Sequence, residues 1–214
     1  MSDLALLECR QCKRLAGHLA QVRKDFPGYH ARPVLPFGVA VPKLLVVGLA
    51  PGMHGANRTG RPFTGDYAGI LLYETLFKHG FSNQPQGAEP NDGLKLKHCR
   101  ITNAVKCLPP DNKPEPAEVR RCNRYLAAEI AAVQPQAILA LGAIAHRAVL
   151  MALGLKPGPY AFGHGASHEL PLTTGGSVRL FDSYHCSRYN TNTGRLTREM
   201  FEAVFRDLSR YLRR

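Results

Sequence analysis

Residues 44–66 read Leu44-Leu45-Val46-Val47-Gly48-Leu49-Ala50-Pro51-Gly52-Met53-His54-Gly55-Ala56-Asn57-Arg58-Thr59-Gly60-Arg61-Pro62-Phe63-Thr64-Gly65-Asp66. An apolar run opens this stretch, and a helical pattern from Ala68 to His79 follows it. A buried strand that leads through a glycine-rich loop into a helix is where α/β proteins bind ligands. Five glycines allow close approach of the backbone, and an aromatic ring, two guanidinium groups, an amide and a carboxylate lie among them. This mixture suits a planar ligand that carries phosphate.

The rest of the chain alternates strand and helix patterns, which predicts one α/β domain over residues 1–214 with a parallel sheet covered on both faces. Because ligands bind beyond the carboxyl ends of such strands, we expect residues 48–66, 103–107 and 184–187 to share one rim. The expected strands are residues 43–49, 100–105, 137–141 and 178–183, and the expected helices are 4–24 (one helix or a pair), 68–79, 116–133, 142–153 and 197–213. We expect loop over 27–42 and 109–114, and loop or irregular strand over 154–176.

The composition is that of a folded, strongly basic protein. Of its 214 residues 44% are hydrophobic, and 28 Lys and Arg against 16 Asp and Glu give a formal net charge of +12. A charge excess of this size favours a polyanionic partner such as nucleic acid. No apolar run reaches the roughly 18 residues of a membrane span, so we expect a cytoplasmic, nucleoid-associated protein with no membrane partner.

Four of the six cysteines are candidate metal ligands: Cys9, Cys12, Cys107 and Cys122. The first two are three residues apart, so one tight bend could hold both thiolates on a metal, while the other two lie on a loop and the next helix. These unequal spacings leave zinc, an iron–sulfur cluster and unpaired buried thiols all open. We expect Cys99 in the core, and Cys186 lacks the orienting partner that a cysteine nucleophile beside a histidine needs.

Four side chains on the expected rim each have a functional and a structural interpretation. Asn103 can read the edge of a base or serve as a loop amide, and Phe63 can stack on a flat ligand or fill the core. His185 can donate to a developing negative charge or be a satisfied loop residue. Asp66 can orient water and face a cation, or cap the following helix. Their shared position on one rim favours the functional interpretations.

The glycine loop matches neither common nucleotide-binding pattern. Residues 55–60 have the frame of a phosphate-binding loop, but Arg61-Pro62 replaces its lysine and hydroxyl residue. The spacing of the glycines does not fit G-x-G-x-x-G either. Neither an NTPase nor a dinucleotide-binding enzyme is therefore supported.

Over nearly its whole length the chain resembles the uracil-DNA glycosylase superfamily, most closely its family 5, the iron–sulfur type with broad base tolerance. The resemblance rests on the motifs Gly48–Gly52, His54–Arg61 with Phe63–Asp66, Ile101–Cys107, His185–Thr191 and Thr193–Thr197, together with the four cysteines. It implies a three-layer α/β/α fold around a central four-stranded parallel sheet. It also implies an enzyme that flips uracil and other damaged bases out of DNA and hydrolyses the N-glycosidic bond. We expect this enzyme to be a monomer and to be monofunctional, leaving an abasic site.

The resemblance also assigns roles to individual residues. It implies a [4Fe–4S] cluster on the four cysteines, catalysis by Asp66 and His185, and a base pocket formed by Ala50, Gly52, Phe63 and Asn103. We expect DNA to contact Asn57, Arg58, Arg188, Tyr189 and Arg195, with Tyr189 filling the vacated stack. The cluster is expected to present Lys106 and Lys113 toward DNA.

One position departs from other branches of the superfamily, which place a polar, water-activating residue where this chain has Ala50. The absence of that residue is typical of family 5 and argues against the narrower family 4 type. Cys186 stands where proline is frequent in the last motif. A nucleic-acid-binding protein without catalysis is the other alternative, because it would have the same charge and glycine loop.

Overall fold

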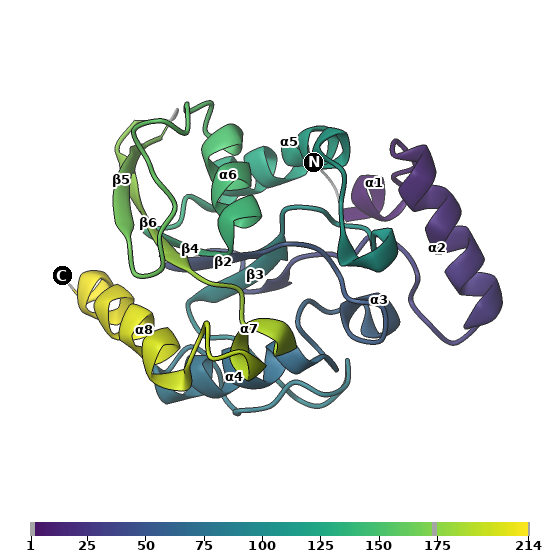
Figure 1. Ribbon diagram of the computed structural model, residues 1–214, viewed down its shortest axis with the longest axis horizontal. Coiled ribbons are helices and arrows are strands. Elements are labelled where there is room, and N and C mark those ends of the chain that lie inside the picture. The colour runs from purple at the N-terminus through teal and green to yellow at the C-terminus, as the bar shows by residue number, and fades with distance from the viewer. Residues whose placement is uncertain (1–2, 173–174, 214) are drawn as a thin grey trace.

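The computed structural model, which describes residues 3–172 and 175–213, contains a mixed sheet with the strand order β1-β3-β2-β4-β6-β5 between two layers of helices (Figure 1). The strands are β1 (Phe37–Gly38), β2 (Leu44–Gly48), β3 (Cys99–Asn103), β4 (Ala137–Leu141), β5 (Ser167–Pro171) and β6 (Ser177–Ser183). The helices are α1 (Asp3–Leu7), α2 (Lys13–Asp25), α3 (Ala56–Thr59), α4 (Tyr67–Lys78), α5 (Pro116–Val133), α6 (Ala143–Ala152), α7 (Arg188–Asn192) and α8 (Arg198–Leu212), with a 3₁₀ turn η1 (Pro110–Asn112).

The layers follow from the alternation of side chains along the central strands. On β2, Leu44 and Val46 pack with residues of α4 and α8, whereas Leu45 and Val47 face the opposite side and pack with α5 and α6. A strand buried on both faces needs apolar residues at every position, which is why β2 reads as a continuous apolar run. Figure 1 shows these two helix pairs on opposite sides of the sheet.

The predicted parallel sheet is confirmed, since β3, β2, β4 and β6 pair in parallel. Two antiparallel edge strands add to it: β1 beside β3, and β5 beside β6. β1 lies in a segment that we expected to be loop, and it is only two residues long. β5 is an edge strand whose one buried side chain is Leu170, so it lacks a hydrophobic pattern.

The N-terminal helices attach to the domain at one end of the sheet (Figure 1). Leu6 of α1 and Leu15 of α2 pack with Val105 and Tyr125. Arg14 lies 2.6 Å from Glu118 on α5, so an ion pair supplements the apolar contact. Within the described residues every helix is too short or too polar to cross a lipid bilayer.

The structure corrects the expectation that Lys106 faces DNA. Its side chain is 1% exposed, its ammonium group lies 3.2 Å from Glu129 Oε2, and it also donates to the Thr102 hydroxyl. The other carboxylate oxygen of Glu129 accepts from Arg100 at 2.8 Å. A buried ammonium group needs such partners because it has lost its hydration. Lys106 therefore joins β3 to α5 inside the protein, while Lys113 is exposed.

Replacing Glu129 tests this buried network. Glu129→Ala leaves the buried ammonium of Lys106 without its carboxylate, so the free energy of unfolding should fall by about 3–5 kcal/mol in urea titrations. The matched control is Glu169→Ala, which removes an exposed partner of Arg179 and should cost at most about 1 kcal/mol. Equal losses in the two variants would contradict the network.

Candidate active site

A close approach of three chain segments forms the site at the carboxyl ends of the central strands. Gly48 ends β2 directly opposite Asn103, which ends the parallel strand β3. A Cβ atom at Gly48 would overlap Asn103 Oδ1 and would lie 2.7 Å from the Phe63 ring. Glycine at this position therefore lets the amide and the ring lie against the end of β2.

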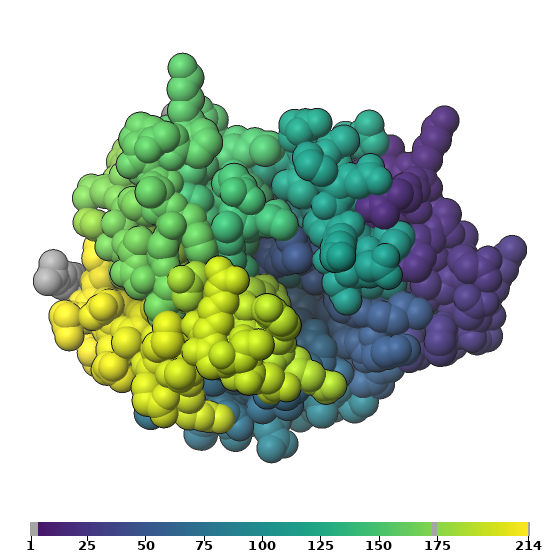
Figure 2. Space-filling view, viewed as in Figure 1, coloured from purple at the N-terminus to yellow at the C-terminus, as the bar shows by residue number. Residues whose placement is uncertain are grey.

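A cavity of about 420 Å³ opens beside these residues. Figure 2 shows the surface hollowed here, between the yellow-green segment that contains α7 and the teal segment that contains η1. Seven residues predicted to act at the site line this cavity, and they come from the glycine loop, β3 and the segment after β6: Ala50, Gly52, Phe63, Asp66, Asn103, His185 and Arg188.

The backbone holds Phe63 in an uncommon conformation. Its φ is +55°, which is costly for a bulky residue and persists only where the surroundings enforce it. Tyr73 donates to the Pro62 carbonyl at 2.7 Å, and Gly69 gives the Phe63 carbonyl room that a side chain would take. Phe63 belongs to the core and also lines the cavity, so both interpretations of this residue apply.

Asp66 likewise both caps a helix and lines the cavity. Its Oδ1 accepts from Gly69 N at 2.9 Å and so caps α4, while the side chain lines the cavity. Burial raises the pKa of this carboxyl group, and the N–H groups of Gly69 and Ala68 partly oppose that rise. A Cβ atom at Gly55 would lie 2.6 Å from Asp66 Oδ2, so this glycine leaves space for the carboxylate.

His185 follows β6 and stacks on Phe63, with ring centroids 6.1 Å apart and an interplanar angle of 27°. Asn190 donates to the His185 carbonyl at 2.8 Å and so fixes the backbone there. Burial lowers the pKa of the imidazole to about 4. The ring is therefore neutral at pH 7, with one nitrogen as donor and one as acceptor.

Asn103 provides the clearest sign that the cavity binds a ligand. The side chain is 3% exposed, and its Oδ1 has no hydrogen-bond partner among the described residues. A buried amide oxygen without a partner costs about 1–3 kcal/mol. Because Asn103 lines the cavity, a ligand with a donor at this point would remove that cost.

The structure corrects the predicted DNA contact of Asn57, whereas Arg58 is partly exposed and also makes contacts within the protein. The Asn57 side chain is fully buried, with Nδ2 donating to the Met53 carbonyl at 3.4 Å, so Asn57 cannot reach DNA. Arg58 pairs with Glu89 at 3.0 Å and donates to the His54 carbonyl at 2.9 Å. Its guanidinium group is thus used to hold the glycine loop.

The other predicted contacts lie at the surface. Tyr189 on α7 is 72% exposed, and Arg195 is exposed and lies over the Tyr184 ring, 4.7 Å from its centroid. Arg188 lies over the Tyr67 ring at 5.1 Å from the centroid. These three side chains are available to DNA.

Three further polar residues line the cavity, although the sequence assigned them no role: Tyr67, Asn112 and Ser187. Tyr67 directly follows Asp66, which is the one signal that could have marked it. Asn112 lies in η1 with a φ of +56°, and only the folded turn brings it to the cavity. The hydroxyl of Ser187 caps α7 by accepting from Asn190 N.

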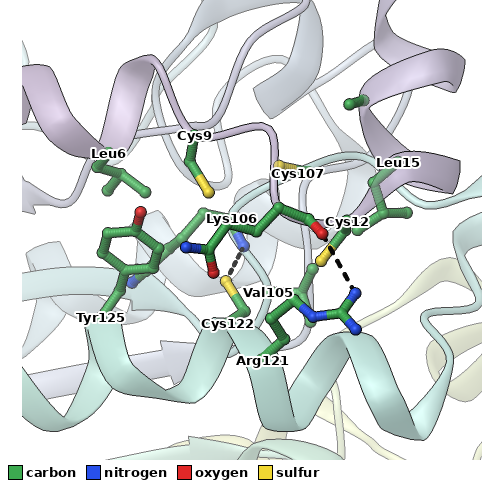
Figure 3. Close-up of a pocket in the computed structure, with 12 residues that line it drawn as sticks. Leu6, Cys9, Cys12, Leu15, Val105, Lys106, Cys107, Arg121, Cys122 and Tyr125 are labelled. Atoms are coloured by element: carbon green, nitrogen blue, oxygen red, sulfur yellow. Dashed lines mark hydrogen bonds between the residues drawn. The ribbon is translucent and has the colours of Figure 1, made fainter.

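The four candidate cysteines line a single pocket at the junction of α1, α2, α5 and the segment after β3, as Figure 3 shows. Lys106 N lies 3.4 Å from the Cys122 sulfur. Burial and the neighbouring cysteines raise the pKa of the Cys107 and Cys122 thiols. By contrast, Cys99 lies in the core as expected, and Cys186 is also buried there.

Comparison with known proteins identifies the family. A family model described as the uracil DNA glycosylase superfamily matches residues 35–209. The chain belongs to this superfamily. It is 45% identical to a type-5 uracil-DNA glycosylase of Thermus thermophilus, over 96% of this chain and 94% of the relative. It is 43% identical to the type-5 enzyme of Pyrobaculum aerophilum, over 94% and 88% of the two chains.

A type-4 uracil-DNA glycosylase of Sulfurisphaera tokodaii is less similar, at 28% identity over 93% of this chain and 80% of the relative. The higher identity to type-5 relatives agrees with the interpretation of Ala50. The resemblance seen in the sequence motifs is thus confirmed at the level of the superfamily.

Gly48→Ala tests whether the close approach at the end of β2 positions the site. The new methyl group must displace the Asn103 amide and the Phe63 ring, so kcat/KM for excision of uracil from DNA should fall by about 100-fold. Circular dichroism should show a retained fold. Gly28→Ala is the matched control because a Cβ atom there meets nothing within 4 Å. Unchanged kinetics in Gly48→Ala would contradict the positioning role.

Proposed function

We propose that the protein is a DNA repair enzyme that extrudes uracil from DNA and hydrolyses its N-glycosidic bond, leaving an abasic site. The observation that carries this proposal is the unpartnered amide oxygen of Asn103, which is buried beside the Phe63 ring in the cavity. The amide offers one acceptor and one donor, and the edge of uracil offers the complementary N–H and carbonyl oxygen. A base stacked on Phe63 would satisfy the amide.

The rim of the cavity carries exposed side chains suited to extruding a base from DNA. A base inside a duplex cannot reach the cavity, and flipping it costs a few kcal/mol. Exposed Tyr189 would fill the vacated stack, and Arg188 and Arg195 would bind phosphates. The net charge of +12 favours association with DNA in general.

The bond between C1′ and the base nitrogen would then break with its electron pair leaving on the base. A neutral His185 donates an N–H to the base oxygen that becomes negative, and one such donor commonly contributes about 3 kcal/mol. Asp66 as carboxylate stabilises the positive sugar and orients a water molecule. The water oxygen bonds to C1′, and its proton passes to the carboxylate or to solvent.

We also propose that the enzyme accepts further deaminated bases. Ala50 places a methyl group on the cavity wall where other branches have a polar side chain. This wall therefore requires fewer hydrogen-bonding groups at matching positions on the base. We further propose that the enzyme works on nucleoid DNA as a monomer. A DNA-binding protein without catalysis would share the charge, but it would not excise the base.

Asp66→Asn tests the enzyme proposal and the role of the carboxylate together. Asparagine still caps α4, so the fold and DNA affinity should persist while excision falls by at least about 100-fold. Excision is measured as alkali-sensitive strand breaks in uracil-containing duplex. In the unsubstituted enzyme the rate should fall on acidification at a higher pH than for an ordinary aspartate, because the raised pKa makes the carboxylate protonate earlier.

The control for Asp66→Asn is Asp25→Asn, which removes an exposed carboxylate at the end of α2 and should leave excision unchanged. Absence of excision by the unsubstituted protein would refute the enzyme proposal. Normal excision by Asp66→Asn would refute the assigned role.

We propose that Cys9, Cys12, Cys107 and Cys122 hold a [4Fe–4S] cluster. A single zinc ion at about 2.3 Å from each sulfur would hold the sulfurs about 3.8 Å apart. Among the described residues, the one group of three metal-type ligands within 4.8 Å of each other is His146, His168 and Asp182, and no three cysteines form such a group. The wider spacing suits a cluster, which is larger than an ion.

When bound, the cluster would supply no step of the hydrolysis. It would join α1 and α2 to α5 and to the segment after β3, next to the Pro109–Lys113 turn that carries Asn112 into the cavity. Its contribution is therefore to the position of this turn and to stability.

Metal analysis tests the cluster. The purified protein should contain about four iron and four sulfide per chain. Cys122→Ser should lower both iron content and melting temperature, whereas Cys99→Ala, which replaces a buried cysteine outside the pocket, should keep its iron. A protein that contains zinc and no iron would refute the proposal.

A further inference from the structure

A second cavity of about 420 Å³ lies directly beside the base cavity. Both cavities are lined by Asp66, Tyr67 and Arg188, and the guanidinium group of Arg188 lies over the Tyr67 ring. These stacked side chains form a partition between the cavities. The remaining lining of the second cavity is Gly65, Gly69, Ile70, Glu74, Gln86, Gly87 and Ala88.

The lining of this cavity suits a flat ligand with a polar edge. Tyr67 and Ile70 lie one turn apart on α4, are 36% and 55% exposed, and together give this cavity an aromatic and an aliphatic surface. Gln86 supplies an amide to this lining. Stacking on aromatic side chains is a common way in which proteins bind the bases of single strands.

The charges in this cavity also permit a phosphate chain. Its one carboxylate besides Asp66 belongs to Glu74, and Arg198 lies 2.7 Å from Glu74 Oε2. Arg188 adds a guanidinium group at the partition. The two carboxylates and the two guanidinium groups balance, so the cavity does not repel an anionic strand.

We propose that the second cavity binds the nucleotide adjacent to the extruded uracil when the DNA is single-stranded; this inference rests on the proposed glycosylase function. The cavities are separated by the residues that line both, Asp66, Tyr67 and Arg188. A nucleotide joined covalently to the extruded one is therefore within reach of the second cavity. In a duplex the neighbouring base is held in the stack by its partner strand. A single strand leaves it free to enter.

The test uses the full-length protein and single-stranded oligonucleotides that contain one uracil. The base on its 5′ or its 3′ side is either present or replaced by an abasic spacer, and the matching duplex is assayed in parallel. The variants are Ile70→Glu, which places a carboxylate on the cavity floor, and Phe77→Glu. Phe77 is also an exposed apolar residue of α4, but it lies outside the cavity and so controls for the added charge.

A spacer on one of the two sides should raise KM on single strands about tenfold, within the range that base stacking on proteins gives, with kcat within about twofold. Ile70→Glu should raise KM for the unmodified single strand by a similar factor and should abolish the effect of the spacer. Phe77→Glu should do neither. On the duplex, Ile70→Glu and Phe77→Glu should behave alike.

The inference is overturned if neither spacer changes KM, or if Ile70→Glu and Phe77→Glu behave alike on single strands. Failure to excise uracil from any substrate would refute the glycosylase function instead. In that case the dissociation constants of the same oligonucleotides, measured by fluorescence anisotropy, still test the cavity by the same comparison.

Discussion

The site depends on Gly48, whose lack of a side chain lets Asn103 and Phe63 pack against the backbone at the end of β2. Parallel pairing of β2 and β3 brings Asn103 to this point, and the left-handed backbone at Phe63 turns the ring toward it. The ring in turn stacks with His185 from the end of β6. A hydrogen-bonding amide, a stacking ring and a neutral imidazole thus share one wall because one glycine leaves room for them.

Buried ion pairs join the sheet to α5 near the site. Glu129 accepts from both Lys106 and Arg100, so α5 is joined to β3 in the residues just before the cysteine-bearing segment. The cysteine pocket then links α5 to α1 and α2. This arrangement fixes the turn at Asn112 on one side of the cavity, while α7 carries the exposed residues of the other side.

The sequence predicts the four parallel strands and their rim correctly because continuous apolar runs and turn residues mark them locally. It leaves β5 undecided between loop and irregular strand, because only Leu170 of that strand is buried, and it does not show β1, which is two residues long and pairs with β3. The cavity residues of the glycine loop were predictable from the motif, whereas Asn112 enters through a turn with a left-handed backbone.

The incorrect predictions concern charge and burial. Lys106 is a cation in a basic protein, which favours DNA, but its position between Thr102 and Glu129 places it inside. Asn57 lies within the glycine-rich loop, but α3 turns its side chain inward. Sequence spacing does not specify which face of a short helix is covered, so the burial of such side chains depends on tertiary packing.

In the proposed mechanism the wall formed by Phe63 and Asn103 binds the extruded base. The most direct measurement is a crystal structure of Asp66→Asn bound to an oligonucleotide that contains uracil. We predict the uracil stacked on Phe63 with its edge hydrogen-bonded to the Asn103 amide. A uracil that remains in the DNA stack, or that binds elsewhere while Asn103 Oδ1 stays without a partner, would contradict the account.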